Sequence, residues 1–259
     1  MKKALVTGAS SGIGREFAFQ LARAGYRILA VARREERLQE LLAELPGEQH
    51  GYCVADLSSQ AGRDRVLEAI SEEHLDLLVT NAGLSVLEPF YESSLQRQRD
   101  ILAVDCQAVV ELSHGFLAQS QAGDALINLG SIVSYLPTPA QPIYSGSKAF
   151  VAAFSECLWE EQRERGVYVM ALCPGMTATE FVSEATGGAA DGSELPGSMV
   201  QTSEEVVAEG MRALAKRHKA IVVTGRVNRL MLLLPSFLTR HRLIKVLAVM
   251  GDPDRAMGT

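Results

Sequence analysis

"TGASSGIG", residues 7–14, follows the short apolar run "KALV" almost at the start of the chain. Gly8, Gly12 and Gly14 all stand in this stretch, although glycine costs backbone entropy and brings no side chain to the core. Either a ligand approaches the backbone here, or the chain only turns tightly from a strand into a helix. The residues that follow along the chain bear on this choice.

Short apolar runs, typical of buried parallel strands, alternate with helical patterns along the chain. The apolar runs cover 2–8, 26–32, 51–57, 75–83, 124–131, 167–175 and 219–225. The helical patterns cover 13–24, 35–45, 63–73, 95–118, 144–166 and 202–217. This alternation predicts an α/β fold, with one parallel sheet and helices on both faces, formed by residues 1–259 as a single domain.

The composition is that of a folded domain with a sizeable core. The chain has 259 residues, of which 47% are hydrophobic and 22% charged, and its net charge is −6. The negative charge argues against a nucleic-acid partner or an anionic membrane. Histidines and cysteines show no metal-ligand spacing, so we expect no metal site and expect the cysteines to be buried. The N-terminus lacks a signal-peptide pattern, and we expect a cytoplasmic protein.

The glycine stretch separates the first expected strand from the first expected helix. A helix N-terminus presents unpaired N–H groups and a partial positive charge, which suit a phosphate. Gly8, Gly12 and Gly14 would let a dinucleotide pyrophosphate reach the backbone. Their spacing is G-x-x-x-G-x-G and differs from the G-x-G-x-x-G fingerprint, so a tight turn without a ligand stays open on this evidence alone.

Polar residues end the third and fourth expected strands, at the edge where open parallel sheets bind ligands. Asp56 could accept a hydrogen bond from an adenine amine, or it could cap the next helix. "NAG", residues 81–83, brings another glycine to the same edge, where it could also be a plain loop turn.

Arg33 and Arg34 follow the second expected strand, where an NAD enzyme usually carries an acid that binds the ribose hydroxyls. An arginine early in a helix opposes the helix dipole, so its position suggests a ligand. A 2′-phosphate would supply charge-assisted hydrogen bonds, and we therefore predict NADP(H) as cofactor. The alternative is a solvated surface pair offset by Glu35 and Glu36.

Tyr144 and Lys148 stand four residues apart, on one face of an expected helix. A tyrosine hydroxyl is a poor acid or base at neutral pH, but a neighbouring ammonium favours the phenolate and so lowers its pKa. Ser131 ends the fifth expected strand, where its hydroxyl could bond a substrate carbonyl or simply cap a turn. Together the three residues predict proton transfer to a carbonyl oxygen.

These motifs, in this order, closely resemble those of the short-chain dehydrogenase/reductase family. The likeness covers about residues 3–225, and "CPGMTATEF" at 173–181 resembles the family segment after the sixth strand. It implies a single-domain, doubly wound Rossmann sheet of seven strands and hydride transfer between a nicotinamide and a carbonyl or alcohol carbon. It also implies that Ser131 orients the carbonyl, Tyr144 is the acid or base, and Lys148 binds the ribose and tunes Tyr144.

The resemblance also implies a set of cofactor contacts along the carboxyl edge of the sheet. Arg33 in particular is similar to a basic residue of NADP-preferring members. The expected contacts are Gly8, Ser10, Ser11, Gly12, Ile13, Gly14, Arg33, Arg34, Asp56, Leu57, Asn81, Ala82, Gly83, Tyr144, Lys148, Pro174, Gly175, Thr177 and Thr179.

Two positions depart from the family pattern. Thr80 stands where a first asparagine usually precedes "AG", and we expect little effect. Asp105 stands where many members carry an asparagine of a water-linked proton relay. Its carboxylate would raise the pKa of Lys148 and shift the pH–rate profile. The alternative is that the backbone carbonyl carries the relay and either side chain is tolerated.

An apolar pocket wall suggests a hydrophobic carbonyl or alcohol substrate. Its expected members are Val86, Leu87, Val133, Leu136, Pro137, Met176, Phe181 and Val182. Residues 176–201 are expected to form a lid that orders with ligand, because a long irregular loop in a compact domain is usually functional.

The C-terminal extension, residues 226–259, is apolar with interspersed basic side chains. It could cover the substrate pocket or a subunit interface, pack on the sheet, or lie on a membrane surface as an amphipathic segment. The resemblance implies a homodimer or homotetramer through the helices that begin near Leu95 and Tyr144. The alternative to an enzyme is a sensor or scaffold that binds NADP(H) without efficient turnover.

Overall fold

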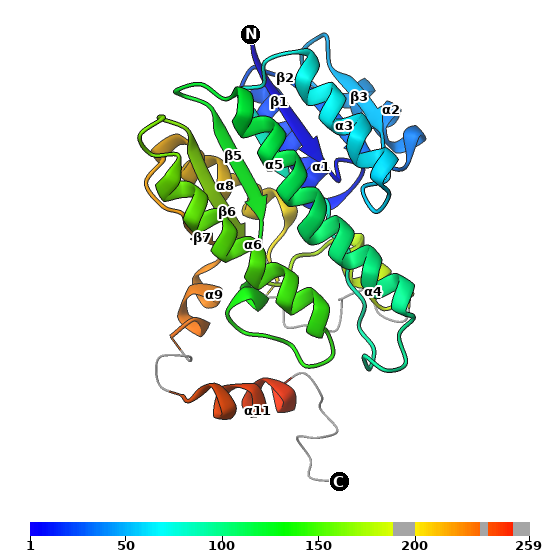
Figure 1. Cartoon of the computed structure of the whole chain (residues 1–259), viewed down its shortest axis with the longest axis vertical. Coiled ribbons are helices and arrows are strands. Elements are labelled where there is room, and N and C mark those ends of the chain that lie inside the picture. The colour runs from blue at the N-terminus through cyan, green and yellow to red at the C-terminus, as the bar shows by residue number, and fades with distance from the viewer. Residues whose placement is uncertain (189–199, 234–237, 251–259) are drawn as a thin grey trace.

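A seven-stranded parallel sheet with the order β3-β2-β1-β4-β5-β6-β7 forms the centre of the molecule (Figure 1). The computed structural model describes residues 1–188, 200–233 and 238–250. The strands are β1 (Lys2–Thr7), β2 (Tyr26–Ala32), β3 (Gly51–Val54), β4 (Leu77–Thr80), β5 (Ala125–Leu129), β6 (Tyr168–Cys173) and β7 (Ile221–Val223). Every apolar run predicted as a strand contains one of them, which confirms the predicted fold class.

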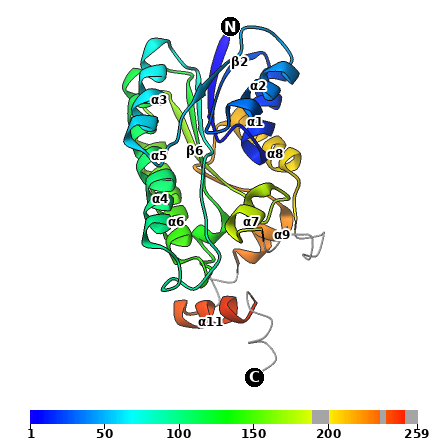
Figure 2. The same cartoon turned by 90° about the vertical axis from the view of Figure 1, so that its right-hand side faces the viewer.

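Helices cover both faces of the sheet, as Figure 2 shows. Successive side chains of a strand point to opposite faces, so Ala4 and Val6 of β1 join one core while Leu5 joins the other. The first core is covered by α1 (Gly12–Arg23), α2 (Glu35–Glu44) and α8 (Ser203–Lys216). The second is covered by α3 (Gln60–Glu72), α5 (Ala108–Gln119) and α6 (Pro142–Glu161).

The strand order reverses between β1 and β4, because β1 pairs with β2 on one side and with β4 on the other. Loops that leave these strands in opposite directions open a crevice at the carboxyl edge, where such sheets bind ligands. This topology brings the glycine stretch next to residues 81–83, although they are distant in sequence.

The helix predicted at 95–118 is continuous but irregular. It consists of α4 (Leu95–Leu102), a π-helical turn η1 (Ala103–Gln107) and α5. By length and hydropathy alone, Leu95–Gln119 could cross a membrane. Half of its most apolar window is buried in the fold, with Leu112 and Phe116 of α5 in the second core. Packing against the sheet therefore accounts for its hydropathy.

Several local expectations are confirmed and others need correction. The helix predicted at 202–217 is present as α8, and Thr202 and Glu205, at the spacing typical of a capping box, form one at its start. The helix predicted at 144–166 begins two residues earlier and ends at Glu161. The cysteines are not all buried, because only Cys173 is fully buried and Cys157 on α6 is exposed.

The segments predicted as a lid and a C-terminal extension contain helices. The described part of the lid holds the short helix α7 (Glu180–Ala185), and Thr177 pairs with Gln201 through an isolated bridge. Residues 189–199, which belong to the expected lid, lie outside the described residues. The extension forms α9 (Arg226–Met231) and α11 (Arg240–Met250), beyond the carboxyl edge of the sheet (Figure 1).

Candidate active site

Other atoms of the protein lie so close to Gly8 and Gly14 that a side chain at either position would clash with them. A Cβ on Gly8 would lie 2.7 Å from Asn81 Nδ2, and one on Gly14 would lie 2.3 Å from the Gly8 carbonyl oxygen. Asn81 Nδ2 donates to the Thr7 carbonyl at 3.0 Å, and Thr7 Oγ1 accepts from the Asn81 and Ala82 amides at 3.0 Å. The side-chain amide of Asn81 thus holds the first turn of the sheet to the end of β4, and its contact with a cofactor stays a prediction.

The start of α1 nevertheless fits a pyrophosphate. Its N-cap Ser11 makes no side-chain capping bond, and no acid stands in its first turn. By contrast, Ser59, Ser94 and Thr202 each accept a backbone N–H at the start of α3, α4 and α8. The first N–H groups of α1 therefore have no capping side chain and are available to an anion. The starts of α2, α6 and α9 also lack a capping side chain, so the glycine stretch is what distinguishes α1.

Arg34, rather than Arg33, turns toward the glycine stretch. Its Nη2 donates to Ser10 Oγ at 3.1 Å and to Ser11 Oγ at 3.2 Å. Arg33 is exposed, and among the described residues its guanidinium makes no recorded bond. Of the two arginines predicted for the phosphate, the structure brings Arg34 to the proposed site.

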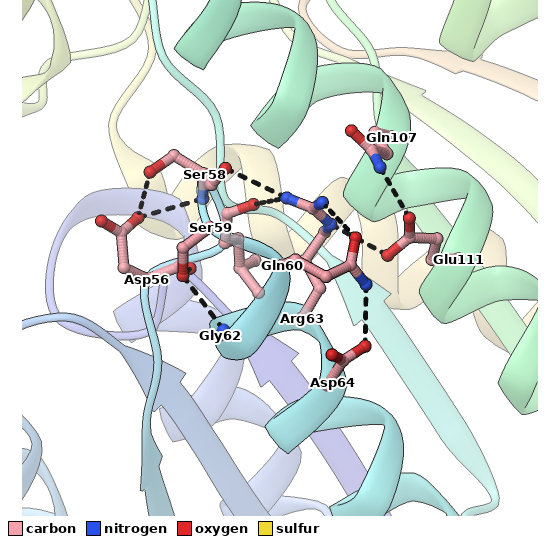
Figure 3. A network of polar contacts seen from close by, with 10 residues as sticks. Asp56, Ser58, Ser59, Gln60, Gly62, Arg63, Asp64, Gln107 and Glu111 are labelled. Atoms are coloured by element: carbon pink, nitrogen blue, oxygen red, sulfur yellow. Dashed lines mark hydrogen bonds and ion pairs between the residues drawn. The ribbon is translucent and has the colours of Figure 1, made fainter.

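Asp56 and Ser58 lie in a loop next to the Arg63 guanidinium, as Figure 3 shows. Leu57 belongs to the same loop, which Arg63 braces. The carboxylate of Asp56 accepts from the Ser58 backbone and hydroxyl, while Ser59 caps α3, so the alternative of Asp56 as that cap is wrong. The buried Arg63 guanidinium donates to the Leu57 carbonyl at 3.0 Å and pairs with Glu111 of α5 at 2.9 Å.

This brace was not predicted. The sequence pattern places Arg63 in an amphipathic helix but does not indicate its partner, because Glu111 lies 48 residues away. The bond to Leu57 fixes the loop that is expected to face the adenine.

The three predicted catalytic residues lie close together. Ser131 follows the carboxyl end of β5, and Tyr144 and Lys148 stand in the first two turns of α6. Lys148 Nζ lies 5.6 Å from the centre of the Tyr144 ring and donates to the Leu129 carbonyl at 3.0 Å. Ser131 is buried, accepts from the Val133 amide at 3.3 Å, and acts on the Tyr144 phenol as a hydrogen-bond partner that lowers its pKa. Ser131 thus caps the short turn η2 (Ile132–Ser134) and also faces the phenol.

Asp105 completes this cluster from the π-helical turn η1. Its Oδ2 lies 3.2 Å from Lys148 Nζ, and its Oδ1 accepts from the Leu84 amide at 2.8 Å. A π turn adds a residue to a helix and is frequent at functional sites. A Cβ on Gly83 would lie 3.3 Å from Lys148 Nζ, so this glycine leaves room for the ammonium.

The buried charges set the direction of each pKa in the cluster. Burial raises the pKa of Tyr144, Lys148 opposes it, and Asp105 adds to it, with a net upward shift. The Lys148 ammonium thus lowers the pKa of Tyr144, as expected, but in the protein without cofactor burial outweighs it. Burial lowers the pKa of Lys148, but the Asp105 carboxylate and the Tyr144 phenol together raise it above that of an ordinary lysine.

A series of buried, hydrogen-bonded side chains joins the elements that carry this cluster. Thr80 Oγ1 donates to Asn128 Oδ1 at 2.7 Å, and Asn128 Nδ2 donates to Ser155 Oγ at 3.0 Å. The series links β4, β5 and α6, so Thr80 supports the strand edge as expected. Asn128 was missed because a polar residue inside an apolar strand gives no sign of its partners.

The loop after β6 lies over the glycine stretch. A Cβ on Gly12 would lie 3.0 Å from Thr179 Cγ2, and one on Gly175 would meet the Asn228 side chain. Thr177 Oγ1 donates to the Gly175 carbonyl, and the Pro174 carbonyl accepts from the Ile132 amide. These four predicted contacts therefore reach the same edge of the sheet.

The predicted pocket wall is partly assembled. Phe181 of α7 lies with its ring centre 5.5 Å from that of Tyr144. Val133 and Pro137 line a cavity of about 320 Å³ together with Arg240 and Ile244 of α11. Val86 and Leu136 are buried, Leu87 and Met176 are exposed, and the side chain of Val182 lies outside the described residues.

The family model described as short chain dehydrogenase matches residues 2–189. The chain belongs to this family. Among curated short-chain dehydrogenases, sulfoacetaldehyde reductase 2 of Chromohalobacter salexigens is 34% identical over 191 residues, which are 71% of this chain and 76% of that protein. Serine 3-dehydrogenase of Agrobacterium fabrum is 31% identical over 73% of this chain and 78% of its own length.

A solved short-chain dehydrogenase from Sphingobium yanoikuyae, in complex with NADPH, has the same fold. Its TM-score is 0.81 at 27% identity, with 92% of this chain and 93% of that chain covered. The family and the seven-stranded Rossmann architecture expected from the resemblance are thereby confirmed.

At the opposite edge of the sheet, the structure brings together three side chains that the sequence did not connect. One ligand atom each from His74, Asp76 and Asp124 lies within 4.8 Å of the others. Asp76 and Asp124 already accept backbone N–H groups, from Lys3 and Gln121, both at 2.7 Å. These bonds explain why the two carboxylates stand at the starts of β4 and β5.

Proposed function

We propose that this short-chain dehydrogenase transfers a hydride between NADP(H) and the carbonyl or secondary alcohol carbon of an apolar substrate. The observation that carries the proposal is the cluster of Ser131, Tyr144 and Lys148 at the edge where the glycine stretch leaves α1 uncapped. NADP(H), when bound, supplies or accepts the hydride.

Each residue of the cluster has a distinct role in this proposal. Ser131 bonds the substrate oxygen and orients the carbonyl. Tyr144 gives its phenolic proton to that oxygen during reduction and takes it back during oxidation. Lys148 stabilises the phenolate electrostatically, and Asp105 holds the ammonium in place while it raises the pKa of both groups.

NADP(H) is proposed over NAD(H) because of Arg34. The glycine stretch and the end of β2 flank the ribose in a dinucleotide fold, and Arg34 lies between them on Ser10 and Ser11. A guanidinium there can bind a 2′-phosphate through charge-assisted bonds. Ala32 stands near the position where NAD enzymes place an acid.

An apolar substrate is proposed from the side chains of the expected pocket wall. Phe181 packs against Tyr144. Val133 and Pro137, expected in the same wall, line a separate cavity whose lining also includes Ser134, Thr138, Ser145 and Arg240. The names of the two curated relatives denote small polar compounds. Other relatives, 33% and 28% identical, are named very-long-chain 3-oxoacyl-CoA reductase and 17-beta-hydroxysteroid dehydrogenase type 3, which denote large apolar compounds. The relatives therefore do not decide the substrate class, and the apolar preference is proposed from the residues of this protein. In this proposal α11 covers the substrate side of the site.

The test is NADPH oxidation with a panel of bulky ketones and aldehydes beside small polar aldehydes. We expect turnover of bulky compounds, and a loss of about 10²–10⁴-fold in kcat in Tyr144→Phe, because general acid catalysis contributes about that much. Tyr91→Phe is the matched control, because that side chain is 84% exposed. Equal activity of Tyr144→Phe and wild type would refute the mechanism, and turnover of polar aldehydes alone would refute the substrate class.

The assembled cluster gives no support to the alternative of a sensor without turnover. We also propose, as the family resemblance implies, a cytoplasmic homodimer or homotetramer. Leu102, Val110 and Phe150 expose apolar surface on the helices expected at that interface. Size-exclusion chromatography that shows only monomer would contradict the oligomer.

A further inference from the structure

Glu180, the first residue of α7, is held by two arginines beside the glycine stretch. Its Oε2 lies 3.2 Å from Arg34 Nη1, and its Oε1 lies 3.5 Å from Arg37 Nη1. Each carboxylate oxygen thus faces one guanidinium. Arg34 uses its other terminal nitrogen on Ser10 and Ser11, so the carboxylate lies at the outer side of the proposed phosphate site.

A phosphate monoester presents the same kind of anionic oxygens as this carboxylate. Arginine binds both in a forked, bidentate manner, and one set of N–H donors cannot fully serve two anions. We infer that Glu180 competes with the 2′-phosphate of NADP(H) for Arg34 and Arg37, and so sets how strongly the protein distinguishes NADP(H) from NAD(H). This inference rests on the proposed function, which places that phosphate on Arg34.

The exposure of the three side chains makes the exchange feasible. Those of Arg34, Arg37 and Glu180 are 38%, 46% and 45% exposed. A carboxylate released from this site moves into water and leaves no unpaired buried charge. The competition weakens NADPH binding but leaves NADH binding unchanged, because NADH has no phosphate to place there.

The exchange also reaches the substrate side, because Phe181 follows Glu180 in the same turn. The far end of α7 is held separately, by the Leu87 amide on the Ala185 carbonyl at 2.9 Å and by Arg97 on the Glu184 carbonyl at 3.0 Å. The Phe181 amide also donates to Thr179 Oγ1 at 3.3 Å, so a phosphate that displaces Glu180 removes one of the contacts of the turn that places Phe181 against Tyr144.

The experiment compares Glu180→Gln with Glu184→Gln in the full chain. Glu184 lies on the same helix, its side chain is exposed, and its carboxylate has no recorded bond among the described residues. Both variants remove one charge from α7. Dissociation constants are measured for NADPH, NADH and adenosine 2′,5′-bisphosphate by calorimetry at low salt.

We expect Glu180→Gln to bind NADPH and the bisphosphate about three- to tenfold more tightly than wild type, because it frees two exposed ion-pair partners. NADH binding should not change, and Glu184→Gln should match wild type. If NADPH binding in Glu180→Gln is unchanged or weaker while wild type still prefers NADPH, the competition is refuted and the cofactor proposal stands. If wild type binds NADH as well as NADPH and Arg34→Ala changes neither, both proposals fail.

Discussion

Two ion pairs flank the proposed active site, and they differ in nearly every physical respect. Asp105 and Lys148 are 0% and 4% exposed, and each is held by further bonds to Leu84 and Leu129. Arg34 and Glu180 are 38% and 45% exposed and join a strand end to the short helix α7. The first pair lies within the core of the domain, and the second faces water.

The difference predicts which pair is permanent and which is exchangeable. Separating a buried pair leaves a charge without water or partner, which is costly, whereas an exposed pair contributes little and forms or breaks easily. The buried pair can therefore hold the protonation state of Tyr144, and the exposed pair can yield its arginine to a phosphate. The variants below test this contrast.

The largest effect is expected for Lys148→Met, which leaves Asp105 buried without its partner. Breaking a buried ion pair from one side costs about 3–5 kcal/mol, so the free energy of unfolding should fall by that amount, and activity should be lost. Urea unfolding measures the first effect. The double variant Asp105→Asn/Lys148→Met should recover much of the stability, and a loss equal to the sum of the two single variants would contradict the coupling.

Arg34→Ala should weaken NADPH binding by about 10- to 100-fold, because a hydrogen bond to a charged group contributes about 1.5–3 kcal/mol. NADH binding should change little. Arg33→Ala is the matched control, since that neighbouring guanidinium is exposed and makes no recorded bond in the part of the chain that the structure describes. If Arg33→Ala weakens NADPH binding more than Arg34→Ala does, then Arg33, the residue that the family resemblance favours, binds the phosphate.

Asp105→Asn should move the pH–rate profile to lower pH. It should also lower the free energy of unfolding, though by less than Lys148→Met, because the buried Lys148 ammonium loses its counter-charge but keeps the Leu129 carbonyl as an acceptor. The Asp105 carboxylate raises the pKa of both Tyr144 and Lys148, so its removal lowers both. Ketone reduction needs the protonated phenol and falls as pH rises through that pKa, so its falling limb should begin at lower pH. Alcohol oxidation needs the phenolate, so its rising limb should shift in the same direction. If the pH–rate profiles of both reactions stay unchanged, the backbone carbonyl carries the proton relay and the side chain at position 105 has no part in it.

The smallest effect is expected for the stability of Glu180→Gln. Exposed ion pairs contribute about 0–1 kcal/mol, so urea unfolding should differ from wild type by no more than that. A loss above about 2 kcal/mol would mean that the pair is part of the fold, and α7 would then not exchange.

The sequence predicted the sheet and the set of residues at its edge because both depend on local patterns. It could not choose between Arg33 and Arg34, since neighbouring side chains in extended backbone point in opposite directions and the direction depends on how the strand ends. It could not see that Asn81 packs on Gly8, or that Glu180 meets Arg34 across 146 residues. The π turn that carries Asp105 adds one residue to a helix, which apolar periodicity does not reveal.

The titration of Tyr144 itself tests the central claim, that the buried pair governs the proton of this phenol. Ultraviolet difference titration against Tyr144→Phe isolates its signal among the six tyrosines. With NADP⁺ bound, the midpoint should be lower in Asp105→Asn than in wild type and higher in folded Lys148→Met. Coincident midpoints in all three proteins would contradict the account.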